Sequence, residues 1–310
     1  MEAPQGGFFL SKIDFTKPAI TLDAQLDLLR QRGLEISDVG KAKHFLQFVG
    51  YYRLSGYYRY YTDPADPKRE RFVPGISFEQ LVEIYNFDRR LRALFTRAFE
   101  RVEVAVKATL SDAGAQAHGP FWLCEPSNFD RGSHRLITEV LDGCVGDRNH
   151  PHQHMFINQF MNKYSQPYPP SWMMTEIMSF GSISKIYKFS KGHIRQAVSS
   201  KFDLQHDVME SWLHSLSFAR NVCAHHNRIW NRAFTIKPKI PRIYSSHWPT
   251  FGHDKLFVIC GMTWHLTKLI DNSSPWASRL EQLIDRRPGV PLKAMGFPDN
   301  WREIPPWNFH

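Results

Sequence analysis

The sequence predicts an all-α protein, and three observations support this. Apolar residues recur mostly three and four positions apart, few segments alternate with period two, and several segments carry helix-start and helix-stop residues. The 310 residues are enough to bury a sizeable core. With 42% hydrophobic and 22% charged residues, the composition is that of a globular protein rather than a disordered chain.

Two short helices are expected near the N-terminus. The first begins at Thr21, places Leu22, Leu26 and Leu29 on one face, and stops at Gly33. The second covers about residues 37–49, and its expected inward positions are Val39, Ala42, Leu46 and Val49. Residues 62–77 hold three prolines and a charge cluster, which predicts a solvated loop.

The longest helix is expected over about residues 78–112. Ser77 and Gln80 form a capping-box pattern at its start. Its expected inward stripe consists of Leu81, Ile84, Leu91, Leu94, Phe95, Ala98, Val102, Ala105, Val106 and Thr109. Its outer faces are expected to carry Arg89, Arg90, Arg92, Arg97, Arg101 and Lys107.

The rest of the chain predicts further helices and then a tail. Shorter helices and loops are expected between residues 119 and 170, followed by helices over 171–180, 182–190 and 204–226, the last capped by Asp203. Residues 255–270 are apolar nearly all round, as in a central bundle helix. We therefore expect an N-terminal extension (1–20), an all-α domain (21–272) and an extended Pro/Trp-rich tail (273–310) packed on that domain.

Charge and cysteine content limit the partners and the compartment. The net charge of +9 and pI near 9.4 favour a polyanionic partner, with nucleic acid ahead of an acidic membrane surface. The sequence shows no signal-peptide pattern and no apolar run of roughly 18 residues, so we expect a cytoplasmic protein without a membrane partner. Four widely spaced cysteines without a CxxC pattern predict buried free thiols.

The densest cluster of polar functional groups covers residues 220–232. On an ideal helix, one arc of about 140° contains Arg220, Asn221, Ala224, His225, Arg228, Asn231 and Arg232. The opposite side contains Val222, Cys223, Ile229 and Trp230, with His226 among them. This geometry favours His225 over His226 as the histidine that shares a face with Arg220, although the helix could end between the two.

These side chains fit RNA cleavage. Arginine holds a phosphate through its fork and offsets charge on a pentavalent phosphorane, histidine exchanges protons near neutral pH, and asparagine orients either group. The cluster contains no acidic residue, which argues against a Mg²⁺ site, so we expect no metal and no cofactor. The combination suggests metal-independent cleavage by attack of a 2′-hydroxyl, leaving a 2′,3′-cyclic phosphate.

The same residues resemble a known family. Arg220-Asn221-x3-His225 fits the R-x4-6-H motif of HEPN ribonucleases, and His226 also fits its spacing. The string RNVCAHHNRIWNR closely resembles the signature of abortive-infection (Abi-like) proteins of the AbiD/AbiF type, which are bacterial anti-phage factors. The segments FVGYYRLSGYY (48–58), YNFDRRLRALFTRAFERVEVAVKA (85–108) and MGFPDNWREIPPW resemble other parts of that family, so the resemblance covers about residues 20–307.

The resemblance implies a HEPN-like helical bundle that forms a homodimer, with two Arg–His motifs combined into one ribonuclease site. It implies RNA as substrate and, in some relatives, a structured small RNA as partner; an antitoxin or other regulator could also control the protein. Carried over to this chain, Arg220 and His225 are catalytic, Asn221 is the polar residue after the arginine, and His226 is the alternative base.

Other residues leave alternatives open. Arg53, Arg228, Asn231 and Arg232 are candidate RNA-binding residues, and the tyrosines of segment 51–61 could stack on bases or pack on the bundle. His150, His152 and His154 could bind a metal or lie in a solvated loop, which we favour. Glu103 lies among arginines on the long helix, where it could form an intrahelical ion pair or orient an active-site arginine. The rival functions are a non-catalytic RNA-binding protein that holds a structured small RNA, a module that docks an acidic protein, and a metal-dependent nuclease.

Overall fold

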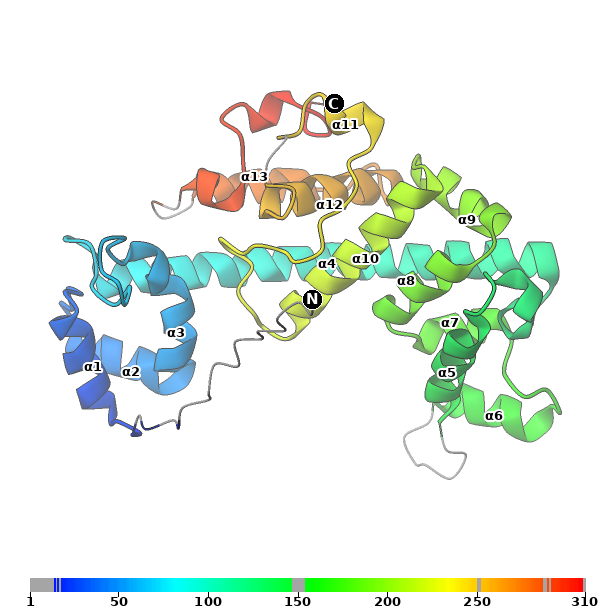
Figure 1. Ribbon diagram of the computed structural model, residues 1–310, viewed down its shortest axis with the longest axis horizontal. Helices are drawn as coiled ribbons and strands as arrows, with labels where there is room; N and C mark the ends of the chain where they lie inside the picture. The colour runs from blue at the N-terminus through cyan, green and yellow to red at the C-terminus, as the bar shows by residue number, and fades with distance from the viewer. Residues whose placement is uncertain are drawn as a thin grey trace, which may run out of the picture. The chain divides into compact units, whose positions relative to one another are not determined.

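The structure, a computed structural model, describes residues 14, 16, 18–146, 154–249, 252–286, 289 and 291–308. These residues form thirteen α-helices, several 3₁₀ turns and isolated β-bridges, and none of them lies in a β-strand (Figure 1). The predicted all-α fold is therefore confirmed. No helix in the described ranges is long and apolar enough to cross a membrane.

The chain divides into two compact units, Met1–Tyr85 and Asn86–His310. The first unit contains α1 (Leu22–Gln31), α2 (Val39–Val49), α3 (Tyr51–Tyr58) and the start of α4 (Phe78–His118). The second unit contains the rest of α4 and all later helices. The domain boundaries predicted at residues 20 and 272 stay a prediction.

In the first unit, the helix caps and the buried apolar residues agree with the sequence prediction, with one exception. The Thr21 hydroxyl accepts the Ala24 N–H at 3.2 Å, which starts α1, and Asp38 caps α2 in the same way. Leucines of α1 and α2 are buried in the core of the unit. Val39, expected to face inward, is 41% exposed, because α2 begins at this residue and its first turn projects beyond the core.

The tyrosine-rich segment 51–61 forms α3 and a 3₁₀ turn. Tyr57 and Tyr58 are buried, which confirms that these two rings pack in the core, whereas Tyr52 is 90% exposed. Residues 62–77 form the expected loop, with one antiparallel bridge between Thr62 and Phe72.

Helix α4 begins with the predicted capping box. The Ser77 hydroxyl accepts the Gln80 N–H at 3.2 Å, and the Gln80 side chain accepts the Ser77 N–H at 2.9 Å. Most of the predicted stripe is buried, but Leu94, Ala105 and Thr109 are only partly buried. The outward placement of Arg92 was wrong. It lies buried one turn after Asp88 and pairs with it, which satisfies its charge.

The helices of the second unit surround an apolar centre. After α4 come α5 (His134–Val145), α6 (Met155–Lys163), α7 (Ser171–Ile177), α8 (Phe180–Phe189), α9 (Gly192–Ser199), α10 (His206–Ala224), α11 (Arg242–Ser245), α12 (Leu256–Ile270) and α13 (Trp276–Asp285). Residues 256–267 of α12 are all buried, as predicted for a central helix. Helix α10 packs on α8, α9 and α12 and is capped by Gln205 rather than by Asp203, whose backbone is left-handed.

The chain after residue 272 packs on the second unit, as expected, but it is not extended throughout. It forms α13 and two 3₁₀ turns. Indole N–H groups tie it down: Trp248 donates to the Pro305 carbonyl at 2.7 Å, and Trp264 donates to the Pro306 carbonyl at 3.2 Å. Trp276 of α13 donates to the Leu94 carbonyl of α4 at 3.2 Å. The tryptophans of the segment itself, Trp276, Trp301 and Trp307, are buried, as packing residues are.

Candidate functional site

The Arg–His motif lies at the C-terminal end of α10. The helix ends at Ala224, and His225 is its C-cap. The His226 N–H donates to the Cys223 carbonyl at 3.0 Å and the Asn227 N–H donates to the Val222 carbonyl at 2.9 Å, the two bonds of a Schellman motif. The helix expected over residues 204–226 therefore ends at Ala224, close to the point between His225 and His226 where we expected that it could end. The ideal-helix arc drawn through residue 232 does not apply beyond this turn, and helical spacing does not choose between the two histidines.

His226 occupies the position of that motif where glycine is usual. Its φ of 56° is left-handed, a conformation that crowds the Cβ of an L-residue. Such a residue is strained, and strain of this kind clusters at functional sites. Both His225 and His226 are exposed in this turn, and they follow Arg220 by five and six residues in the sequence.

Substituting glycine for His226 should therefore separate stability from function. His226→Gly is expected to raise the free energy of unfolding by up to about 1 kcal/mol, because glycine adopts this φ without strain. Urea denaturation of the variant and the wild type measures the difference. A loss of more than about 1 kcal/mol would show that the imidazole makes contacts that outweigh the strain.

A carboxylate on α4 holds the arginine of the motif. The Arg220 Nε lies 3.4 Å from Glu103 Oε2, and Arg220 Nη1 donates to Asn221 Oδ1 at 3.3 Å. The Arg220 side chain is 39% exposed and that of Glu103 only 12%. Glu103 also pairs with Lys107 at 3.1 Å, so it makes both the intrahelical pair and the contact to the arginine. This arrangement holds the guanidinium at Nε and at Nη1 and leaves the side chain part-exposed.

A second carboxylate on α4 anchors the chain that follows the motif. Asp88 is fully buried, and its Oδ1 accepts the N–H groups of Ile229 at 3.1 Å and Trp230 at 2.7 Å. Its Oδ2 pairs with the buried Arg92. Ile229 and Trp230, which an ideal helix would place opposite Arg220, are buried by this return of the chain onto α4 and not by a helical face.

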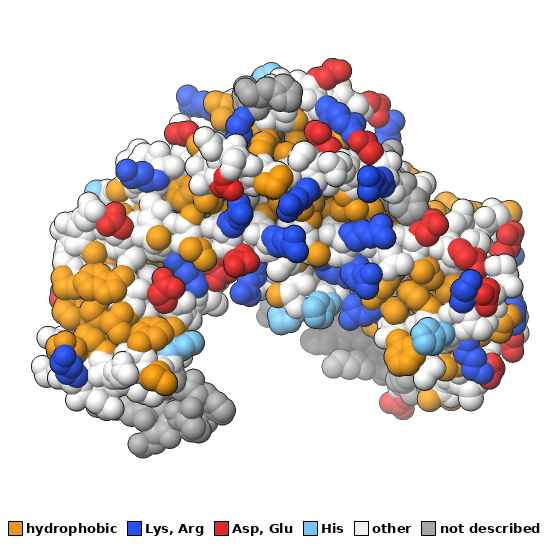
Figure 2. Space-filling view, turned by 180° about the vertical axis from the view of Figure 1, so that it is seen from behind, with side chains coloured by type: hydrophobic (Ala, Val, Ile, Leu, Met, Phe, Trp, Pro, Cys, Tyr) orange, Lys and Arg blue, Asp and Glu red, His pale blue; other side chains and the backbone are white. Residues whose placement is uncertain are grey.

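Both carboxylates lie on one side of α4. At about 100° per residue, Asp88, Arg92 and Glu103 fall within roughly 60° of each other. Exposed arginines at 90, 97 and 101 form a row roughly 120–160° away from Glu103. The arginine row of α4 is therefore separate from the Arg–His motif. Figure 2 shows that Lys and Arg side chains gather across the middle of the face that it draws.

The four predicted RNA-binding residues differ in their surroundings. Arg228 and Arg232 are partly buried, and their guanidinium carbons lie 5.8 Å from the ring centroids of Trp230 and Phe218, respectively. Asn231 is also partly buried and has a left-handed φ of 46°. Arg53 is exposed on α3, in the first unit. The RNA-binding roles of these four residues stay predictions.

The comparisons with known proteins agree with the motif. A family model described as Abi-like protein matches residues 44–231, which is more than half of the chain. The chain belongs to the Abi-like protein family. No curated protein and no solved structure matches it.

The residues that match the Abi-like family model contain the Arg–His motif. The match includes Asp88, Glu103 and the Arg220 to Asn231 segment, and it ends just before Arg232. The R-x4-6-H motif alone gives no sign of the two carboxylates, because they lie more than a hundred residues upstream on α4. The expectation that no acidic residue lies in the cluster holds for the sequence segment but is wrong for the site in three dimensions.

The cysteines and the remaining histidines of this Abi-like protein are the other side chains that could take part in chemistry. Burial raises the pKa of the Cys223 thiol to about 12, so Cys223 is no nucleophile at neutral pH. All four cysteines are unpaired, and Cys223 and Cys260 are buried. His154 caps α6, whereas His150 and His152 lie outside the described residues. Within the described ranges, no three His, Cys, Asp or Glu side chains gather closely enough to hold a metal ion.

Proposed function

We propose that this Abi-like protein is an endoribonuclease of the HEPN class that cleaves RNA without a metal ion. One observation carries the proposal: Glu103 holds Arg220 with its side chain part-exposed, and two exposed histidines follow at the end of the same helix, α10. Family membership indicates a role in abortive infection, which is a defence against phage. RNA cleavage that halts growth of the infected cell would supply that defence.

The motif of one protomer supplies a base and a phosphate-binding group for such a reaction. The 2′-hydroxyl oxygen attacks the adjacent phosphorus, a new O2′–P bond forms, and the P–O5′ bond breaks. A histidine takes the 2′-hydroxyl proton, and the departing 5′-oxygen gains a proton. Arg220 binds the phosphate and offsets the charge that develops on its oxygens, while Asn221 holds the arginine from the other side.

A homodimer would supply the second proton-transfer group. Two copies of the α10 end facing each other would bring together two arginines and four histidines, so that the acid and the base come from different protomers. Single-stranded RNA is the favoured substrate, because the bases of an A-form duplex are hard to reach. The net charge of +9 favours its binding.

The histidines provide the test of this proposal. Purified wild type, His225→Ala and His226→Gly are incubated with labelled total RNA in excess EDTA. We expect the wild type to cut and at least one of the two variants to lose cleavage while remaining folded. Equal cutting by all three proteins would contradict a catalytic histidine in the motif. RNA that is bound but never cut would favour the non-catalytic RNA-binding function instead.

Glu103 is expected to act through Arg220. Glu103→Gln removes the charge that holds the guanidinium, so the cleavage rate should fall about tenfold. Combined with Arg220→Ala, the same change should cause no further loss, since its partner is already absent. Single-turnover cleavage rates of the wild type, the two single variants and the double variant form a double-mutant cycle that measures this coupling. Additive losses would show that Glu103 acts independently of Arg220.

A further inference from the structure

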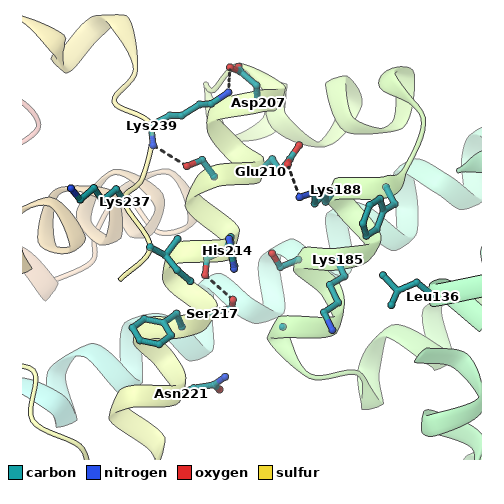
Figure 3. A pocket seen from close by; sticks show the side chains of 16 residues that line it. Leu136, Lys185, Lys188, Asp207, Glu210, His214, Ser217, Asn221, Lys237 and Lys239 are labelled. Carbon is teal, nitrogen blue, oxygen red and sulfur yellow. Dashed lines mark hydrogen bonds and ion pairs between the residues drawn. The ribbon is translucent and has the colours of Figure 1, made fainter. Parts of the chain in front are cut away.

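A cavity of about 640 Å³ lies beside the Arg–His motif, within the second unit. Residues of α8, α10 and the segment 236–239 line it, and Figure 3 shows Lys185 of α8 and His214 of α10 on its two sides. Phe189 and Phe218 add aromatic surface to the lining. Its volume and its mixture of polar and apolar side chains are typical of a small-ligand site.

The charges in this cavity favour an anion. Four lysines and two carboxylates line it. Asp207 pairs with Lys239 at 3.0 Å, and Glu210 pairs with Lys188 at 3.7 Å. Both carboxylates are therefore already matched by cations. Lys185 has no ion pair among the residues that the structure describes, so its ammonium group is available for an anionic ligand.

The cavity adjoins the motif through one residue. Asn221 lines the cavity and also accepts a hydrogen bond from Arg220 at 3.3 Å. His214 lies two helical turns before Asn221 on the same face of α10, and His225 follows one turn after it. His214, Asn221 and His225 thus follow one face of α10 from the cavity to the motif. Figure 3 shows the first two of these, His214 and Asn221, among the side chains that line the cavity.

We propose that this cavity binds the nucleotide next to the scissile phosphate, with Lys185 paired to that nucleotide's phosphate. This inference rests on the proposed ribonuclease function. A nucleotide fits the cavity better than a lone phosphate, because the aromatic rings offer a surface for the base while His214 and Asn221 offer hydrogen bonds. Lysine suits the phosphate as a compact point charge.

Binding of mononucleotides tests the cavity without requiring catalysis. Each of the four nucleoside 3′-monophosphates is titrated calorimetrically into wild type, Lys185→Gln, Lys185→Arg and Lys201→Gln. Lys201 is an exposed lysine outside the cavity and serves as the matched control. We expect Lys185→Gln to weaken binding about tenfold, Lys185→Arg to restore most of it, and Lys201→Gln to change nothing.

Two results would overturn the proposal. One is unchanged nucleotide affinity in Lys185→Gln, and the other is inorganic phosphate that binds as tightly as the nucleotides. Parallel cleavage assays separate this failure from failure of the ribonuclease proposal. If the wild type binds nucleotides through Lys185 but cuts no RNA, the cavity proposal stands and the ribonuclease proposal fails. If the wild type cuts RNA and Lys185→Gln binds nucleotides with unchanged affinity, the ribonuclease proposal stands and the cavity proposal fails.

Discussion

Replacing Arg220 by alanine is expected to lower the rate of RNA cleavage by about 10²–10³-fold. In the proposed reaction the guanidinium offsets charge on the pentavalent phosphate, and loss of one such donor costs this much in other enzymes. The fold should survive, because the side chain is 39% exposed. Arg220→Lys should recover only part of the rate, since an ammonium lacks the two-pronged fork.

The matched control for this experiment is Arg97→Ala. Arg97 is an exposed arginine on the opposite side of α4 from Glu103, and removing it lowers the net charge by the same amount. Single-turnover cleavage and thermal unfolding are measured for each variant. If Arg97→Ala reduces cleavage as much as Arg220→Ala does, overall charge and not the motif determines activity.

The largest expected effect on stability comes from Asp88→Asn. The change leaves the buried Arg92 without its counter-charge, and breaking a buried ion pair in this way costs about 3–5 kcal/mol. Urea denaturation gives the free energy of unfolding. Asp112→Asn, an exposed carboxylate on the same helix, should stay within about 0.5 kcal/mol of wild type.

A second variant isolates the buried charge. The double change Asp88→Asn with Arg92→Met removes both charges, while the asparagine oxygen still accepts the N–H groups of Ile229 and Trp230. Most of the lost stability should return. If the single variant is as stable as wild type, the pair does not anchor the segment that follows the motif.

Local rules predicted most of the helices because they depend on neighbouring residues. The Thr21 cap, the Ser77–Gln80 capping box and the wholly apolar stretch that became α12 are read directly from spacing and residue type. The end of α10 also falls close to the expected one. The left-handed turn at His226 was not predicted, because a histidine occupies the position where glycine is usual and no local pattern marks that substitution.

The two carboxylates of the site differ in what the sequence indicated. Glu103 was one of two readings, as an intrahelical partner or as the residue that orients an active-site arginine, and it makes both contacts. Asp88 was not predicted, although it falls on the same stripe of α4 as Ile84, Leu91 and Phe95. A charge on an apolar stripe is a sign of a buried partner. That its partners are Arg92 and the backbone beyond residue 228 depends on tertiary contacts, which the sequence alone does not specify.

The chemistry of the cut ends tests the central claim most directly. Wild-type protein is incubated in excess EDTA with RNA, and the 3′ ends of the fragments are identified by their sensitivity to a cyclic phosphodiesterase and a phosphatase. Attack by the 2′-hydroxyl predicts 2′,3′-cyclic phosphates that form in EDTA and disappear in Arg220→Ala. Ends with a free 3′-hydroxyl, or cleavage that stops when EDTA is added, would contradict it.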